Sequence, residues 1–312
     1  MHLDPKKIAT LQSGLRDFKP WLLDALREGV ASLEAQPPEF WQTAAARLTD
    51  VGARGAANWL KEIPAQHLQQ PDWAAQTMRI FGDIYLLVQG FERFETLPEA
   101  LQDELLIAAG VTIQAKTLLV QDGILDTWQV LGQHFSRTID GLFARRTWLY
   151  GAANGIFCLL QDYAFEGFAA FTTHWNVGTE LRAEVVYYPG NAGLRGIVKP
   201  QDAPQLAYIT ACTSTESIVY FHYEYAKISA DAPFLSLYPC LLAAVTPTYR
   251  KTDNTFYLID NEGFSLPILC KTAIKWKLLA LSGNAPITVF GEYTGAAVAP
   301  LSVLVGERLV VL

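Results

Sequence analysis

A change of periodicity near residue 110 is the feature of this sequence that most limits its fold. Before that point, apolar residues recur at steps of three and four, which is the period of an amphipathic helix. After it, β-branched and aromatic residues alternate with polar ones, the period of two that is typical of half-buried strands. Tyrosine, which favours strands, occurs once before residue 111 and 12 times after it. The sequence therefore predicts an α+β protein with an N-terminal helical bundle and a mainly antiparallel β region.

Prolines separate the predicted helices of the first 110 residues. The first apolar stripe runs from Leu15 to Leu33 and ends before Pro37. Pro38 suits the first turn of the next helix, because the N–H that proline lacks would have no partner there. The apolar faces of the remaining helices fall within residues 40–48, 53–63, 72–94 and 98–110, with Pro64 ending the third helix. Short connections between such helices predict a compact bundle over residues 1–110.

The β region carries its clearest alternation at residues 127–135 and 181–188. No helix-length pattern separates the strands, which favours antiparallel meanders in a sandwich or barrel-like arrangement over βαβ units. Turn-forming residues mark the connections, at 121–123, 151–155, 189–191, 260–263, 282–284 and 306–307. The Gly- and Pro-rich stretch 189–204 is a candidate boundary between one β unit at 111–204 and a second at 205–312. A single continuous β unit is the alternative.

Composition and charge disfavour several classes of protein. Of the 312 residues 51% are hydrophobic and 18% are charged, which is too apolar for a disordered chain. The opening residues contain no apolar run, and the apolar stretch 233–247 is interrupted at Pro239, so we expect neither a signal peptide nor a membrane span. The net charge is −7, and neither part of the chain has the basic excess that nucleic acid requires of a main partner. We therefore expect a cytoplasmic protein.

The fragment most like a catalytic motif is His222-Tyr223-Glu224, which is followed by Pro239-Cys240. Zinc deaminases combine His-X-Glu with Pro-Cys-X-X-Cys, but Ala243 stands where the second cysteine would be. Two ligands cannot hold that metal, and we predict instead that residues 218–225 form a strand whose His and Glu share a face. The cysteines stand singly in apolar runs, as buried residues do, at Cys158, Cys212, Cys240 and Cys270. We predict no catalytic residue, no cofactor and no metal site.

Arginine and tryptophan on or near predicted strands are the best candidates for contact with a partner protein. These residue types are over-represented where one protein anchors in another. The candidates are Arg145, Arg146, Trp148 and Arg195. The alternative is that the arginines pair with carboxylates such as Asp140 or Asp202 and hold the β region together.

Segments in both parts of the chain, taken in order, match a known pattern. In the helical part they are Gly14 to Gly29, Phe40 to Asp50 and Gly55 to Leu60. In the β part they are residues 126–132, 145–149, 188–196, 276–283, 289–292 and 300–303. Together these segments resemble bacterial SWIM zinc-finger proteins in the region that follows the zinc finger. The finger needs Cys-X-Cys and Cys-X-His, which this sequence lacks, so zinc binding and the contacts made by the finger are not carried over.

The resemblance also implies a setting for function. Proteins of this kind are associated with MoxR-type AAA+ ATPases and with proteins that bear von Willebrand factor A domains. It thus implies a non-catalytic adaptor whose partner is such an ATPase or von Willebrand factor A protein. One alternative is an enzyme or small-ligand binder with a site in the β region, which would need a pocket with carboxylates or a His–carboxylate pair of shifted pKa. The other is a nucleic-acid-associated protein, which would need a basic face.

Overall fold

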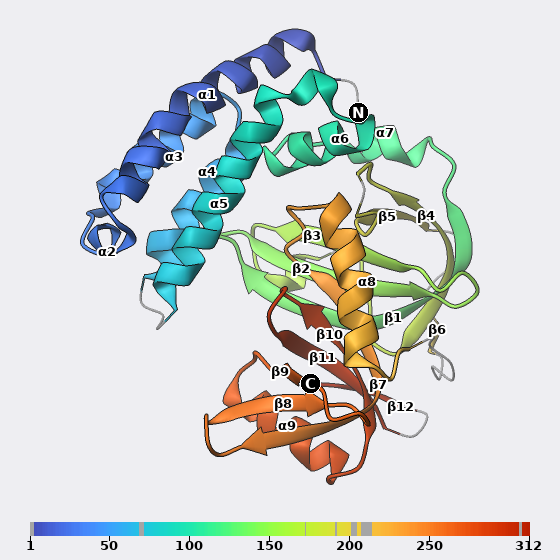
Figure 1. Cartoon of the computed structure of the whole chain (residues 1–312). Coiled ribbons are helices and arrows are strands. Elements are labelled where there is room, and N and C mark those ends of the chain that lie inside the picture. Colours follow the sequence, from blue (N-terminus) through green and yellow to red (C-terminus); the bar gives the residue numbers. More distant parts are fainter. Residues whose placement is uncertain are drawn as a thin grey trace. The chain divides into compact units, whose positions relative to one another are not determined.

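The chain divides into two compact units, Met1–Ile113 with Pro189–Asn191, and Gln114–Tyr188 with Ala192–Leu312. The computed structural model describes residues 3–68, 72–171, 173–190, 192–200, 205–206, 214–305 and 308–312. We call the first the helical unit and the second the β unit (Figure 1). Helices precede mainly antiparallel strands, which confirms the predicted α+β class. The candidate boundary at residue 204 and the predicted turn at 306–307 lie outside the described residues.

The helical unit follows the predicted order of helices, with two differences in detail. Its helices are α1 (Pro5–Arg27), α2 (Val30–Leu33), α3 (Pro38–Asp50), α4 (Arg54–Glu62), α5 (Trp73–Glu92) and α6 (Glu99–Ala108). The apolar stripe 15–33 spans two helices and not one, because Gly29 takes a φ of 91° and interrupts the run. Pro64 does not end α4 abruptly, since the chain continues through a π-helical segment, Ile63–His67.

Aromatic side chains fill the core of the helical unit. Phe18, Trp41 and Phe81 are buried on α1, α3 and α5, and the rings of Trp41 and Phe81 are 6.3 Å apart. Gly55 lets α4 approach the end of α6, where its N–H donates to the Ala109 carbonyl at 2.9 Å. A Cβ atom at Gly55 would lie 2.1 Å from the Ala108 carbonyl oxygen. The close approach of these helices therefore requires glycine.

The described residues of the β unit form two sheets, in which neighbouring strands are antiparallel. The first has the order β3-β2-β1-β4-β5 with β6 on β4, and the second has the order β12-β11-β10-β7-β8-β9. In the first sheet the strands are β1 (Ile124–Arg137), β2 (Phe143–Gly151), β3 (Phe157–Ala164), β4 (Thr179–Tyr187), β5 (Gly196–Pro200) and β6 (Gln205–Leu206). In the second they are β7 (Tyr238–Arg250), β8 (Thr255–Ile259), β9 (Ser265–Pro267), β10 (Ile287–Tyr293), β11 (Val298–Val305) and β12 (Arg308–Val311). The predicted strands 127–135 and 181–188 correspond to β1 and β4.

A β-bulge in β1 controls which residues reach each face of the first sheet. Val130 pairs with Leu149 of β2 and Gly132 pairs with Trp148, so Leu131 is the extra residue. One face of the sheet carries an apolar core of its own, formed by Trp128, Val130, Leu149, Cys158, Leu160, Trp175, Leu181, Ala183 and Val185. The other face packs against the second sheet through Leu131, Trp148, Tyr150, Leu159, Leu241, Phe290 and Leu301. The two faces of β2 therefore have different neighbours.

Helices α7 (Ala115–Leu119), α8 (Ile218–Asp231) and α9 (Thr272–Ser282) lie in the β unit, so the prediction of strands without intervening helices was wrong. The predicted strand 218–225 is the first part of α8. Ser217 caps it by accepting from the Tyr220 N–H, and the buried Asp260 carboxylate accepts from the Ile218 N–H at 2.9 Å. These caps and the burial of Ile218 and Phe221 outweigh the strand preference of the local residues.

The predicted turns have mixed outcomes. Residues 151–155 connect β2 to β3, and residues 260–263 connect β8 to β9, as predicted. Residues 282–284 end α9 instead of joining two strands, since Gly283 takes the left-handed conformation of a helix C-terminus. Within the described ranges, no helix is both long and apolar enough to cross a bilayer.

Candidate functional site

Arg146 and Trp148 lie on the face of β2 that meets the second sheet, and both bind the same carboxylate. Glu292 of β10 is 2% exposed. Its Oε1 accepts from Arg146 Nε at 2.7 Å and from Trp148 Nε1 at 3.0 Å, and its Oε2 accepts from Arg146 Nη2 at 2.7 Å. Such a fork-to-fork pair is strong and geometrically specific. Because it joins β2 to β10, this cluster connects the two sheets of the β unit.

His134 of β1 completes this cluster. Its Nδ1 lies 2.9 Å from Arg146 Nη2. Burial lowers the pKa of His134, the neighbouring Arg146 lowers it further, Glu292 opposes the change, and Lys271 adds to it. The imidazole is therefore held neutral against the guanidinium. A His–carboxylate pair of shifted pKa was the expected mark of an enzyme, but here both Glu292 oxygens are already occupied by Arg146 and Trp148.

Arg145, the neighbour of Arg146, points to the opposite face of β2. It is 5% exposed and binds Asp162 of β3 through Nε at 3.0 Å and Nη2 at 2.7 Å. Its Nη1 donates to the Thr173 carbonyl at 2.6 Å, and its guanidinium lies 4.6 Å from the centre of the Phe171 ring. Arg145 thus fixes the segment after β3 onto the sheet.

Four phenylalanines gather above Arg145. They are Phe135 of β1, Phe143 of β2, Phe168 of the short 3-10 helix Phe168–Ala170, and Phe171. We call them the phenylalanine surface. Phe168 is central, with ring centres 5.3 Å from Phe135 and 4.8 Å from Phe143, both nearly perpendicular. Arg137 stacks on Phe143 at 4.7 Å.

Two of these four rings are exposed to solvent. Phe135 is 46% exposed and Phe168 is 45% exposed, although Phe171 beneath them is buried. Single exposed apolar residues are common on protein surfaces, but grouped aromatic rings held in a fixed arrangement are typical of interaction sites. Arginine and aromatic residues together are also the usual anchors of an interface. The phenylalanine surface is therefore the candidate functional site.

Sequence reasoning missed this surface, because its members come from three separate elements. Phe135 and Phe143 meet through the pairing of β1 with β2, while Phe168 and Phe171 arrive from the loop after β3. No periodic pattern connects them. The one available signal was the density of phenylalanine in residues 165–171, which contain three.

The predicted partner-binding residues have different environments. Arg145 and Trp148 are buried and Arg146 is partly buried, with polar atoms bonded inside the chain. This geometry favours the stabilising alternative, with Asp162 paired to Arg145 and Glu292 paired to Arg146. Asp202, one of the carboxylates named from the sequence, lies outside the described residues. Arg195 is exposed and stacks on Tyr188 at 4.4 Å. A direct partner contact by Arg195 stays a prediction.

The deaminase-like fragment does not assemble. His222 and Glu224 are two positions apart on α8, so they do not share a face as predicted for a strand. Cys240 is buried on β7, and burial raises the pKa of its thiol far above the usual range. Cys158, Cys240 and Cys270 are free thiols, while Cys212 lies outside the described residues. Among the residues that the structure describes, no three His, Cys, Asp or Glu side chains are grouped so as to hold a metal ion.

The helical unit has an open hollow of about 370 Å³ between α1 and α3. Its walls include the rings of Trp21 and Phe40, whose centres are 5.3 Å apart. The other lining residues are Gln36, Pro37, Glu39, Thr43, Ala44 and Arg47. Glu39 is the one carboxylate in this lining, whereas a site for glycoside hydrolysis uses two.

Comparison with known proteins identifies the helical part. Residues 6–109 match the family model of the SWIM-associated four-helix bundle domain. The match runs from α1 through α6 and confirms the resemblance over this part of the chain. No curated protein and no solved structure matches the sequence.

Proposed function

Because residues 6–109 match the family model of the SWIM-associated four-helix bundle domain, we propose that this protein is a non-catalytic adaptor that binds a partner protein through the phenylalanine surface. The partner is a MoxR-type AAA+ ATPase or a von Willebrand factor A protein of the same host, as the family resemblance implies. The observation that carries the proposal is the pair of half-exposed rings, Phe135 and Phe168, fixed over the buried Arg145.

The geometry of the surface suits protein recognition. Fully burying a phenylalanine contributes about 1.5–3 kcal/mol relative to leaving it in water. The rings of Phe135 and Phe168 are already ordered by their mutual contact and by Phe143. A partner that covers them therefore gains apolar burial without ordering mobile side chains.

The chemistry available in the β unit supports binding over catalysis. The buried Glu292 is saturated by Arg146 and Trp148, and the buried Asp126 accepts from the Ala153 and Asn154 N–H groups in the β2–β3 turn. Carboxylates that are bonded in this way stabilise the fold and are not placed to move protons.

The proposal is tested by measuring binding of the purified ATPase and von Willebrand factor A protein by isothermal titration calorimetry. Replacing both Phe135 and Phe168 by serine removes the exposed rings. Hot-spot truncations commonly cost about 2 kcal/mol each, so the affinity should fall by at least about thirtyfold. Tyr163→Ser is the matched control, because Tyr163 is an exposed aromatic on the opposite face of β3.

Two results would contradict the proposal. One is unchanged affinity in the double serine variant, whatever the affinity of Tyr163→Ser. The other is no binding of either partner by the wild-type protein.

A further inference from the structure

Arg137 lies beside the phenylalanine surface, on the same face of the first sheet. The strand register pairs Phe135 of β1 with Arg145 of β2, and it pairs Arg137 with Phe143. Because side chains alternate between the two faces of a strand, these four side chains point to one face, with one phenylalanine and one arginine in each pair. Arg137 is exposed, and its guanidinium lies 4.7 Å from the centre of the Phe143 ring. The phenylalanine surface therefore has a cation at its edge.

The turn between β1 and β2 holds the backbone next to Arg137 in place. The Thr138 N–H donates to the Leu142 carbonyl at 2.9 Å, and the Thr138 Oγ1 accepts from the Leu142 N–H at 3.0 Å. The Gly141 N–H donates to the Thr138 carbonyl at 2.9 Å. Since the contact with Phe143 also limits the positions of the guanidinium, a partner that binds Arg137 has less conformational entropy to remove.

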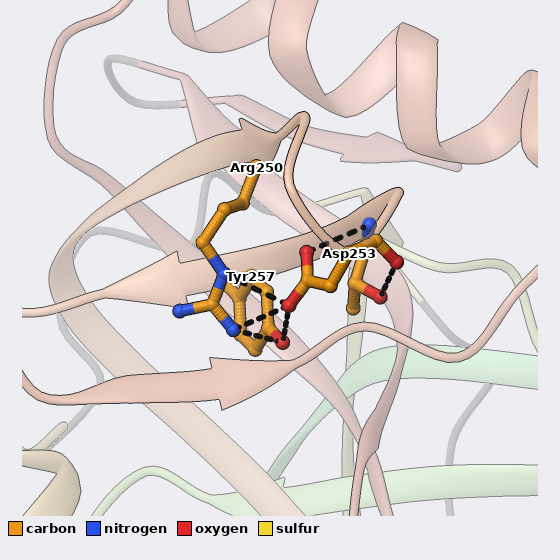
Figure 2. A network of polar contacts seen from close by, with 4 residues as sticks. Arg250, Asp253 and Tyr257 are labelled. Carbon is orange, nitrogen blue, oxygen red and sulfur yellow. Dashed lines mark hydrogen bonds and ion pairs between the residues drawn. The ribbon is translucent and has the colours of Figure 1, made fainter.

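Arg250 and Arg145 show how the β unit satisfies a guanidinium that lies on an aromatic ring. Figure 2 shows Arg250, whose Nε and Nη2 donate to Asp253 at 2.9 and 2.6 Å. Its guanidinium lies 4.0 Å from the centre of the Tyr257 ring, and the Tyr257 hydroxyl donates to the same carboxylate at 2.7 Å. Arg145 likewise lies on a phenylalanine ring and binds Asp162. In both arrangements a carboxylate of the chain meets the N–H groups of the stacked arginine.

The guanidinium of Arg137 has a ring but, among the residues that the structure describes, no carboxylate within ion-pair distance. Asp140, in the turn after β1, is exposed and does not form an ion pair with it. A stacked guanidinium keeps N–H groups that can bind a carboxylate in a forked geometry. We propose that Arg137 selects the partner of the phenylalanine surface by binding a carboxylate of the segment that covers Phe135 and Phe168. This inference rests on the proposed adaptor function.

The spacing of the strand residues restricts the sequence of that segment. Phe135 and Arg137 point to the same face and are two positions apart on β1, which places them about 7 Å apart along the strand. An extended segment has the same spacing between its own residues i and i+2. We therefore expect an apolar side chain over Phe135 and Phe168, with Asp or Glu two positions away at Arg137. The apolar side chain supplies buried area, and the carboxylate supplies specificity.

A protein segment fits this surface better than single-stranded nucleic acid does. Exposed rings can stack on bases, but such binding also needs a groove of positive charge that follows the backbone. On this face Arg145 is already paired with Asp162. The loop that carries Phe168 contains the exposed Glu166, and the net charge of the chain is −7. Arg137 can bind one carboxylate, whereas a run of phosphates needs several cations.

The experiment measures the binding of three fluorescein-labelled peptides to the full chain by anisotropy at low salt. The peptides are repeats of Phe-Ser-Glu, Phe-Ser-Gln and Phe-Ser-Lys, and the quantity compared is the ratio of the affinity for the Glu peptide to that for the Lys peptide. In Arg137→Glu this ratio should fall at least about tenfold, because an attractive contact becomes repulsive. In Arg137→Gln, which removes the charge without reversing it, the ratio should fall about threefold.

Arg182→Glu is the matched control, because it makes the same change of net charge at another exposed arginine of the first sheet. Arg182 stands on β4 between Leu181 and Ala183 of the apolar core, so it points to the face opposite the phenylalanine surface. This variant should keep the wild-type ratio. An equal fall of the ratio in Arg182→Glu and Arg137→Glu would overturn the inference, since it would show an effect of net charge alone.

The Phe135→Ser, Phe168→Ser variant separates this inference from the adaptor surface. It should weaken the binding of all three peptides alike, since it leaves Arg137 in place. If the ratio is the same in the wild type and Arg137→Glu but binding is lost in the double serine variant, the role of Arg137 is wrong and the adaptor surface stands. If the ratio changes as expected but neither proposed partner protein binds, the proposed partners are wrong and the role of Arg137 stands.

Two further results would overturn the inference. One is tighter binding of oligothymidylate than of the Phe-Ser-Glu peptide, which would favour nucleic acid. The other is no binding of any peptide by the wild-type chain. The thermal melting temperature of each variant shows whether a loss of binding reflects a loss of fold.

Discussion

The neighbouring residues Arg145 and Arg146 lie on opposite faces of β2 and have different environments. Arg146 faces the second sheet, where Glu292, Trp148 and His134 surround it. Arg145 faces the other way, where it binds Asp162 and lies beneath half-exposed phenylalanine rings. The first cluster is closed, with both of its carboxylate oxygens bonded inside the chain. In the second cluster the Arg145 guanidinium is bonded inside the chain, whereas two of the phenylalanine rings near it are half-exposed to solvent.

This difference separates residues that maintain the fold from residues that are available to a partner. A buried ion pair is costly to break from one side, because the remaining charge stays buried without a partner. Replacing an exposed ring should lower the free energy of unfolding only slightly, because the ring contributes little to the core. Stability and binding should therefore respond to different substitutions, although both sets of residues lie within one hairpin and its neighbours.

The largest effect is expected from Glu292→Ala. It leaves the Arg146 guanidinium uncompensated and the Trp148 Nε1–H without its acceptor, and removing one partner of a buried pair costs about 3–5 kcal/mol. Urea denaturation should show this as a lower free energy of unfolding. Glu224→Ala is the control, because the Glu224–Lys227 pair is exposed to solvent and should contribute little to stability. Equal effects of the two substitutions would remove the distinction between closed and open clusters.

Arg145→Ala should have the next largest effect. It deprives the half-buried Asp162 and the Thr173 carbonyl of their donor, and we expect a loss of about 2 kcal/mol in the free energy of unfolding. Because Arg145 also supports Phe171, partner affinity should fall in the same variant. Arg145→Lys keeps the charge but not the planar fork, so it should recover only part of the stability. Full recovery by lysine would show that geometry is unimportant here.

Acidification should have a smaller effect, and it acts on the closed cluster. The pKa of His134 is lower in the folded protein than the usual value of about 6.5 in an unfolded chain. The unfolded state then binds more protons between these two values, so the free energy of unfolding falls as the pH drops below about 6.5. Above that pH this contribution is fully present. In His134→Gln, the free energy of unfolding should depend less on pH below about 6.5 than it does in the wild type. The same pH dependence in both proteins would contradict the role given to His134.

The smallest effect on stability is expected from Arg195→Ala. Arg195 is exposed and stacks on Tyr188, and surface substitutions of this kind change stability by about 0.5 kcal/mol or less. A loss of partner capture with unchanged thermal melting would support the contact role predicted from the sequence. Unchanged capture would restrict the adaptor surface to the phenylalanines.

The helical unit could be predicted from the sequence because its signals are local. Apolar spacing and prolines placed α3, α5 and α6 close to their observed bounds. The break at Gly29 was hidden, since the apolar stripe continues across it from Leu26 to Val30 and Leu33. Spacing reports the face of a helix but not the conformation of one glycine between two turns.

The β unit was predicted less well, because its decisive interactions are distant in sequence. The aromatic and β-branched residues of α8 favour a strand, and a carboxylate 42 positions away, Asp260, caps that helix. The spacing of Ile218, Phe221 and Tyr225 was a helical signal that strand composition outweighed. Arg146 and Glu292 are 146 positions apart, and no local pattern could pair them.

The bulge at Leu131 limits which insertions and deletions in β1 would preserve the phenylalanine surface. Beyond it, Gln133, His134 and Phe135 face Thr147, Arg146 and Arg145 in turn. Deleting one residue between the bulge and Phe135 would send the phenylalanine into the interior between the sheets and the histidine out to the open cluster. Length changes are better tolerated in the turn between β1 and β2, but within β1 they exchange the inward-facing and outward-facing side chains. Which side chains form the exposed surface thus depends on the number of residues in β1 after the bulge as well as on their identities.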